Sequence, residues 1–189
     1  SSVHSARLTR VTLEVPEYTV TVKTDDTPGA ALNGESNQRI KAGGFLSPVT
    51  AEPPQGYCFS KWVRDGKHFS YENPLVIPDI REDLEVTAQF SREITDIAEL
   101  RRIGTDPGYP LDGRYCLQKD LDFSGANEDF TAIGSEEAPF SGYFFGNNHA
   151  ITGLQCSQAR QSLEGLFGDV AEGAEIRDLR LENVNITHN

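Results

Sequence analysis

The sequence predicts a mainly β chain made of two modules that are joined by one short helix. Apolar and polar residues alternate with a period of two up to about Phe90, which is the pattern of half-buried strands. Residues 94–103 then place an apolar residue at every third position, as one face of a helix does. Beyond Gly104, short apolar runs are separated by Gly, Asn and Asp, which indicates many short strands and tight corners.

The first module is expected to be a largely antiparallel sheet. Strands are predicted at Val11–Val15, Tyr18–Val22 and Leu84–Phe90, where apolar residues alternate with polar or small ones. Clusters of turn-forming residues at 25–29 and 52–56 separate the strands.

Four segments of this module form an ordered series: the strand YTVTV, the segment GYCFSKW, the turn RDGK and the closing strand DLEVTAQF. In this series residues 17–90 resemble the divergent internalin-type B-repeats of bacterial surface proteins. The resemblance implies a β-grasp-like unit of roughly 70 residues that acts as a spacer or interaction unit in secreted or wall-attached proteins. We therefore place one domain at 17–91, preceded at 1–16 by a linker or the end of another repeat.

The segment Ile94–Ile103 predicts a short amphipathic helix that ends near Gly104. Thr95 is the expected N-cap, acidic residues occupy the first turn and two arginines occupy the last.

An internal repeat follows the helix. Ile151–Cys156 and Ile176–Leu181 share the form apolar-x-x-Leu-x-apolar at an offset of 25 residues, which places Ile151 over Ile176. Periods of this order mark stacked architectures, so we expect the coils of a solenoid, with each strand paired to its equivalent in the next turn. Phe140, Phe144 and Ile151 are expected to point inward. The expected corner residues, which tolerate a positive φ or a close backbone approach, are Gly142, Gly146, Gly153, Gly165, Gly168, Asn147 and Asn148.

The second module reads in order ITDIAELRRI, GRYCLQKDLDFSG, FTAIGS, PFSGYFFGNNHAITGLQC, EGLFGDV and AEIRDLRLENVNIT. In this order residues 93–189 resemble the entry to the right-handed parallel β-helix of bacterial surface proteins, including those with the GLUG motif and immunoglobulin A metallopeptidases. Two departures are Ala159–Ser162, in place of a glycine-rich link, and Phe145, where aspartate is usual. The resemblance implies a cap helix and the first coils of a truncated β-helix over residues 92–189.

Charge and composition exclude several classes of partner. The chain has 17 Lys and Arg against 29 Asp and Glu, a net charge of −12, which repels nucleic acid and anionic lipid. No apolar run reaches the ~18–20 residues that span a bilayer, so we expect no membrane insertion. The chain contains no methionine, which predicts that Ser1 follows a longer natural start. We expect a monomer.

Three cysteines, Cys58, Cys116 and Cys156, allow at most one internal disulfide. No C-x-x-C pair or histidine lies at metal spacing, which excludes an ordinary structural zinc site. We expect all three to be buried thiols.

We predict no catalytic residue and no cofactor. Asp120 and Asp122 would lie on one side of a strand, but no third acid, Arg or Lys at matching spacing supports catalysis. They are expected to cap a corner by accepting backbone amides. Together with Asp129 they are the candidates for calcium, although their spacing is not that of a calcium loop. His149 lacks a nucleophile partner and is expected to be a surface polar residue.

Tyr57, Trp62 and Tyr143 are the aromatic residues considered for glycan contact. Tyr57 and Trp62 belong, with Phe59, to a group of rings at strand spacing, and such rings usually fill the core of a small β-domain. Core packing is therefore the preferred interpretation of Tyr57, Phe59 and Trp62, and a glycan-binding platform is the alternative.

These observations predict a non-catalytic structural or adhesive segment of a large secreted or cell-surface bacterial protein, whose partner is an unknown host or cell-surface protein or glycan. The alternatives are a glycan-binding module, or the N-terminal accessory region of a surface peptidase or a polysaccharide-degrading enzyme. A His-Glu-x-x-His motif beyond Asn189 would favour the peptidase, and a wall anchor after further repeats would favour the adhesin.

Overall fold

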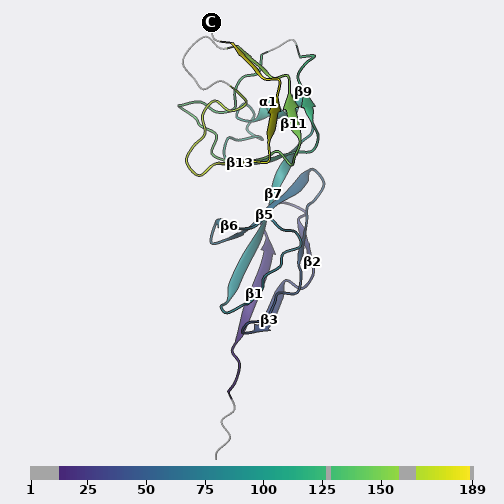
Figure 1. Cartoon of the computed structure of the whole chain (residues 1–189), viewed down its shortest axis with the longest axis vertical. Coiled ribbons are helices and arrows are strands. Elements are labelled where there is room, and N and C mark those ends of the chain that lie inside the picture. The colour runs from purple at the N-terminus through teal and green to yellow at the C-terminus, as the bar shows by residue number, and fades with distance from the viewer. Residues whose placement is uncertain (1–12, 127–128, 158–164, 188–189) are drawn as a thin grey trace, which may run out of the picture.

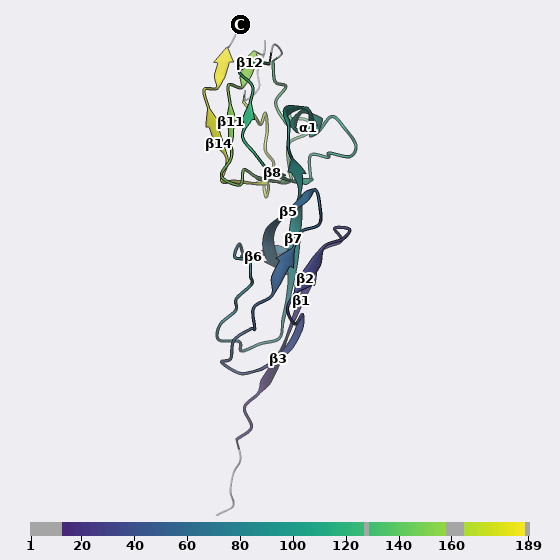
Figure 2. The same ribbon diagram turned by 90° about the vertical axis from the view of Figure 1, so that its right-hand side faces the viewer.

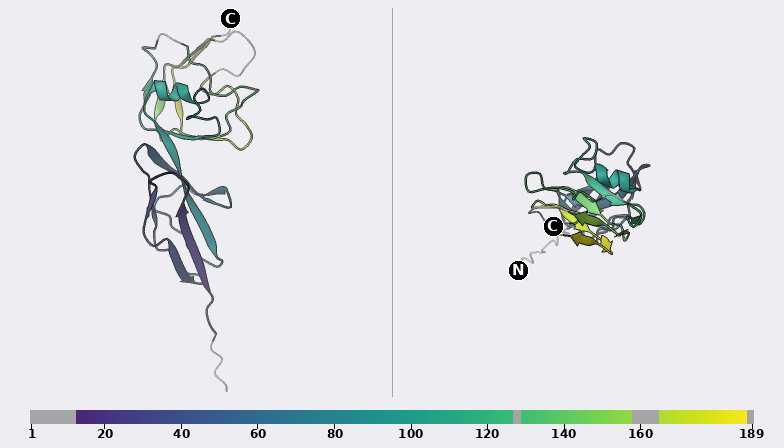
Figure 3. Two further views of the ribbon diagram at one scale, coloured as in Figure 1. Left: turned by 180° about the vertical axis from the view of Figure 1, so that it is seen from behind. Right: turned by 90° about the horizontal axis from the view of Figure 1, so that it is seen from above.

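The computed structural model describes residues 13–126, 129–157 and 165–187. The chain is mainly β, with several sheets and one short helix among the described residues, which confirms the predicted fold class at this level. The molecule is elongated, with β1 and β3 toward one end of its long axis and the C-terminal end of the chain at the other (Figure 1). The view from behind shows the same long outline, and the view from above, along the long axis, shows a compact cross-section (Figure 3).

The first module is built on a mixed sheet in the order β5–β7–β1–β3. Strand β1 is antiparallel to β3 but parallel to β7, and β5 is antiparallel to β7, so the prediction of a largely antiparallel sheet holds except at its central pair. The strands are β1 (Glu17–Thr24), β3 (Asn37–Lys41), β5 (Tyr57–Arg64), its hairpin partner β6 (Lys67–Ser70), β7 (Leu84–Ile94), and a separate antiparallel pair, β2 (Ala31–Asn33) with β4 (Thr50–Glu52).

Alternation in these strands produces the first core. Val20 and Val22 of β1 are buried, as are Val86, Ala88 and Phe90 of β7, because every second side chain faces inward. Other members of this cluster include Leu46, Val49, Ala51, Trp62, Leu75, Ile77, Ile80 and Leu84.

The strand predicted at Val11–Val15 is wrong over its described part. Residues 13–16 form no strand, and the side chains of Leu13 and Val15 are 88% and 56% exposed. The pairing of β1 with β3 begins at Glu17, and only Pro16 O accepts a bond from Ala42 N beyond it. Alternation alone does not form a strand where no neighbouring strand offers its backbone groups.

Helix α1 (Ile97–Arg102) lies where the sequence places it, but its N-cap is Asp96 rather than Thr95. The Asp96 side chain accepts from Glu99 N at 2.8 Å, while the Glu99 carboxylate accepts from Thr95 N at 2.7 Å. Asp96 thus caps the helix, and Thr95, one residue before the cap, is held by the Glu99 carboxylate. Leu100 of the predicted apolar face is fully buried.

The second module contains three ladders of short parallel strands. The first ladder is β8–β10–β13, the second is β9–β11–β14 and the third is β12–β15; β11 and β14 are seen side by side in Figure 2. The strands are β8 (Arg114–Leu117), β9 (Leu121–Asp122), β10 (Tyr143–Phe145), β11 (Ala150–Thr152), β12 (Gln155–Ser157), β13 (Glu175–Arg177), β14 (Arg180–Glu182) and β15 (Asn185–Thr187).

The register of these ladders corrects the predicted repeat. Ile151 pairs with Leu181 and Ile176 pairs with Phe144, so Ile151 does not lie over Ile176. The offset from Ile151 to Leu181 is 30 residues, as it is for the bond from Ala150 N to the carboxylate of Asp120. The shared pattern placed Ile151 of β11 over Ile176 of β13, which belong to different ladders, because three apolar positions in six residues do not specify the partner strand.

The corners carry the residues that the sequence indicates. Asn147 and Asn148 have φ of 52° and 61°, and Gly153 has φ of 72°. The two equivalent corners one level further along the chain have Asp178 and Asn183 at φ of 50° and 51°. Residues with short polar side chains, together with glycine, therefore adopt the left-handed backbone conformation that each turn requires.

The second core lies inside these ladders. Phe140, Phe144 and Ile151 are fully buried, as predicted, beside Tyr115, Leu117, Leu121, Phe123, Phe130, Ile133 and Leu154. Each ladder is two or three strands deep, so the described residues do not build an extended solenoid, and the solenoid that the repeat predicted is not seen among them.

Candidate functional site

The two cores meet at β7, which pairs with strands of both modules. Residues Leu84–Ala88 of β7 pair with β1, and Arg92–Ile94 pair with β8 of the second module. Strand β5 pairs with β7 from Thr87 to Arg92, the stretch that links these two regions. One strand therefore belongs to both halves, and the sheet runs through the junction without a break.

A disulfide crosses the junction. It joins Cys58 of β5 to Cys116 of β8, the two strands that flank the C-terminal part of β7, with the Cα atoms 6.7 Å apart. The prediction of buried thiols is wrong for these two cysteines, because strand pairing with β7 brings together residues that are 58 positions apart. Cys156 is buried as predicted, and its Sγ lies 3.4 Å from Gly165 O.

A cluster of charged and aromatic side chains also bridges the modules. The ammonium of Lys61 in β5 and the hydroxyl of Tyr71 beyond β6 both donate to the carboxylate of Glu175 in β13. Burial raises the pKa of Glu175, but the hydrogen bonds from Lys61 and Tyr71 outweigh it and hold this pKa below its usual value. The carboxylate is therefore charged at neutral pH and binds groups from the other module.

Arg177 completes this cluster. Its guanidinium lies 3.6 Å from the centre of the Tyr71 ring and 4.7 Å from that of Phe145, and it pairs with Asp178. Tyr143 Oη and Arg177 Nη1 are buried and make no hydrogen bond of good geometry among the described residues. Burial raises the pKa of the Tyr143 phenol.

A second ion pair links the modules at another place. Arg114 Nη2 lies 2.6 Å from Asp25 Oδ2, and Arg114 Nε donates to Phe90 O at 2.9 Å. Asp25 also accepts from Thr27 N, so the loop after β1 is tied both to itself and to β8.

On the sheet at the junction, Tyr57, Arg92 and Tyr115 lie in register across β5, β7 and β8. Two hollows of about 260 and 270 Å³ adjoin this row, and Tyr57 and Arg92 line both. The Arg92 guanidinium lies 4.7 Å from the centre of the Tyr109 ring, and hydrogen bonding to Tyr109 raises the pKa of Arg92. Among the residues considered for glycan contact, only Tyr57 belongs to this row.

The other candidate glycan contacts are not open to a sugar. Trp62 is fully buried and its Nε1 donates to Glu72 O at 2.8 Å, and Tyr143 is only 3% exposed. Both rings pack inside the protein, so neither offers a free face. Tyr57 is half-buried, with part of the ring reaching the hollows.

The acidic candidates cap corners, as predicted. Asp120 Oδ1 accepts from Ala150 N at 2.8 Å and contacts His149 Nδ1 at 3.2 Å, while Asp122 Oδ1 accepts from Ser124 N at 2.8 Å. The bond from Ala150 N, followed by the contact with His149, lowers the pKa of Asp120, and bonds from Ser124 lower that of Asp122. The two carboxylates thus serve different backbone amides and do not converge.

The remaining calcium candidate, Asp129, accepts from Arg101 Nη1 through its backbone oxygen. In the described ranges, no three His, Cys, Asp or Glu side chains lie together as metal ligands would. No described helix is long and apolar enough to cross a membrane.

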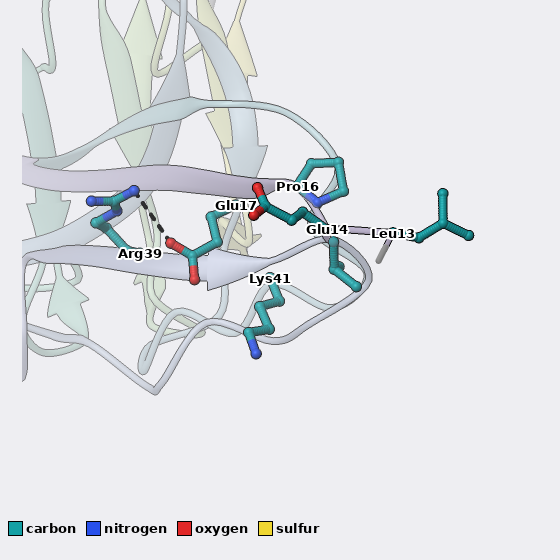
Figure 4. A pocket seen from close by; sticks show the side chains of 7 residues that line it. Leu13, Glu14, Pro16, Glu17, Arg39 and Lys41 are labelled. Atoms are coloured by element: carbon teal, nitrogen blue, oxygen red, sulfur yellow. Dashed lines mark ion pairs between the residues drawn. The ribbon is translucent and has the colours of Figure 1, made fainter. Parts of the chain in front are cut away.

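A further hollow of about 760 Å³ lies where the chain enters β1 (Figure 4). Its one drawn ion pair joins Arg39 Nη2 to Glu17 Oε2 at 3.2 Å, and Leu13 points away from it into solvent. The full lining is Leu13, Glu14, Val15, Pro16, Glu17, Arg39 and Lys41. Because these side chains are largely exposed, the hollow is an open surface and not an enclosed site.

Comparison with known proteins finds one curated relative. The chain is 28% identical over 153 residues to halomucin of Haloquadratum walsbyi (strain DSM 16790 / HBSQ001), an alignment that covers 75% of the chain and 2% of halomucin. The chain therefore spans a small fraction of the length of the relative that it matches. No family model and no solved structure matches the chain.

Proposed function

We propose that this chain is a non-catalytic structural segment of a large extracellular or cell-surface protein, and that it holds the neighbouring segments apart at a fixed orientation. The observation that carries the proposal is strand β7, which is shared by the sheets of both modules. A strand common to two cores cannot hinge between them without breaking its ladder bonds. The elongated shape, with β1 and the C-terminal end of the chain far apart, suits a spacer (Figure 1).

Two observations support the location. The Cys58–Cys116 disulfide is a bond that persists in oxidising compartments and is rare in the cytosol. The likeness to halomucin supports a surface protein, but since that relative is archaeal it does not support the bacterial source that the sequence resemblances imply.

The second module is proposed to be the start of a right-handed parallel β-helix of the GLUG type. Its support is the recurrence of paired strands at an offset of 30 residues, from Leu121 through Ile151 to Leu181. Helix α1 is proposed as its cap, since Leu100 and Ile103 are buried in the same core.

The first module is proposed to be a B-repeat-like, β-grasp-like domain. The mixed sheet with its parallel pair of β1 and β7 supports this, as does a core that ends at Phe90 while the next begins at Ile94. We propose the domain division at 17–91 and 92–189, and the two separate cores support it. The role as an accessory region of a peptidase or polysaccharide-degrading enzyme stays a prediction.

Rigidity at the junction tests the proposed role. We expect backbone 15N relaxation of the oxidised chain to give one overall rotational diffusion tensor for amides in residues 17–90 and 95–157. Replacing both Cys58 and Cys116 with alanine should lower the free energy of unfolding by about 4 kcal/mol, the loop-closure value for a 58-residue loop. It should leave the common tensor in place, since β7 still joins the modules.

The matched control for this variant is Cys156→Ala, which removes a buried sulfur but no crosslink and should cost less. Two independent diffusion tensors in the oxidised wild-type chain would show a flexible joint, and the spacer proposal would then be wrong.

A further inference from the structure

Arg92 is half-buried at the junction, and its charge is matched by no ion pair among the described residues. The guanidinium contacts the ring of Tyr109, a neutral partner, at 4.7 Å. The neighbouring Arg114, by contrast, is paired with Asp25 at 2.6 Å. The Asp106 carboxylate acts on Arg92 through space but makes no direct ion pair with it, so the guanidinium holds no directly bound anion among the described residues. A partly buried cation of this kind commonly marks a place where a ligand supplies the direct partner.

Arg92 lies at the edge of the second core, where buried rings adjoin two open hollows. Strand register sets Tyr57 on one side of Arg92 and Tyr115 on the other, and the guanidinium lies over the ring of Tyr109. The two hollows that share Tyr57 and Arg92 measure about 260 and 270 Å³, so each is slightly smaller than the usual small-ligand site.

The two hollows differ in the hydrogen-bonding groups they offer. The first is lined by Thr27 and Asp112 beside Arg92, and the second by Glu93, Thr95 and Glu99. Carboxylates accept from hydroxyl groups, whereas an arginine binds an anion through its planar fork. A ligand that fills both hollows therefore carries one acidic group, several hydroxyl groups and a face that can lie on a tyrosine ring.

We propose that these hollows bind a carboxylate-bearing sugar residue within an otherwise neutral glycan. The carboxylate would pair with Arg92, the ring would stack on the exposed part of Tyr57, and the hydroxyls would donate to the acids around them. The net charge of −12 opposes polyanions at long range, which favours a single acidic residue over a densely charged chain. This inference goes beyond the proposed structural role and does not depend on it.

The test is a titration of the 15N-labelled full chain with neutral oligosaccharides that end in one glucuronate, galacturonate, mannuronate or sialic acid residue. We expect at least one of them to shift the amide signals of Tyr57, Arg92 and residues 108–115. The affinity for the methyl ester of the same oligosaccharide should be lower by a factor of about ten or more, because esterification removes only the charge that Arg92 binds.

Arg92→Gln should weaken the acidic glycan by about tenfold and leave the methyl ester unchanged, and Tyr57→Leu should weaken both. Arg39→Gln is the matched control, since it removes an exposed arginine of β3 far from the hollows. Because Arg92 also packs on Tyr109, Arg92→Lys provides a second variant that keeps the charge; it should bind with intermediate affinity.

The inference would be overturned if none of the four probes shifted the signals at about 10 mM, a concentration well above the Kd of typical ligands. Equal binding of acid and ester, or shifts confined to other surfaces, would overturn it as well. Equal binding of acetate or of a short peptide with a free C-terminus would show a simple carboxylate site in place of a sugar site. The relaxation measurement on the same sample tests the rigidity of the junction independently of glycan binding. A failure of the structural proposal is therefore distinguished from a failure of the binding proposal.

Discussion

At the scale of single residues, glycines decide how closely the turns of the second module approach. A Cβ on Gly142 would lie 2.0 Å from Gly113 O, and one on Gly146 would lie 2.3 Å from Asp178 O. Gly165, which the sequence indicates as a similar corner, has no atom closer than 3.9 Å to an added Cβ. The first two positions therefore require glycine for contact with the neighbouring turn, and the third does not.

Gly142→Ala should lower the free energy of unfolding by about 2–3 kcal/mol, since the neighbouring backbone must move to admit the methyl group. Gly165→Ala is the control and should change it by less than about 0.5 kcal/mol. Urea denaturation of both variants measures the difference; equal losses would mean that the close approach at Gly142 does not exist in solution.

At the scale of elements, neighbouring strands of one ladder differ in how deeply their paired side chains are buried. Ile151 in β11 is fully buried, whereas its partner Leu181 in β14 is 44% exposed, and Ile176 and Ile186 of the same level are 38% and 42% exposed. The strands β13, β14 and β15 each lie at the end of a ladder and have a paired strand on one side only. Their apolar side chains are therefore covered from that side alone.

Replacing Ile151 with alanine should cost about 3 kcal/mol through the cavity it leaves, and Leu181→Ala should cost under about 1 kcal/mol. The pair is matched by position, so the comparison isolates burial. Thermal unfolding of the two variants measures it, and a Leu181→Ala loss as large as that of Ile151→Ala would reveal that something covers the last strands in solution.

At the scale of the whole molecule, residues far apart in sequence fix the two modules together. Lys61 and Glu175 come from β5 and β13, Asp25 and Arg114 from the loop after β1 and from β8. With the disulfide and the shared strand, these contacts surround the junction. The orientation of the modules is thus set by covalent, ionic and backbone contacts at once.

Glu175→Gln should lower the free energy of unfolding at pH 7 by about 1–2 kcal/mol, because two hydrogen bonds lose their charged acceptor. The folded pKa of Glu175 lies below its ordinary value of 4.5, so its contribution is present above that value and is lost as the pH falls through the folded pKa. The gap between wild type and variant should therefore close below about pH 4.

Urea titrations at pH 7, 5, 4 and 3 measure this gap. Glu85→Gln is the control: Glu85 pairs with Lys23, but its side chain is 62% exposed, so its removal should cost less than about 0.5 kcal/mol. A gap for Glu175→Gln that stays constant down to pH 3 would show that the carboxylate does not act through its charge.

The sequence by itself determined the features that depend on near neighbours. Alternation located β1 and most of β7, a three-residue spacing located α1, and Gly153 with Asn147 and Asn148 marked the corners. Each is a property of a few consecutive residues, whose side-chain directions and backbone preferences follow from local sterics.

The tertiary structure alone decided the register and the junction. The 30-residue offset of Ile151 and Leu181, the Cys58–Cys116 bond and the row of Tyr57, Arg92 and Tyr115 all depend on which strands become neighbours. Similar short strands fit several partners locally, and a shift of one residue turns every side chain to the other face. The choice among partners is made by the packing of the whole core, which no segment of the sequence contains.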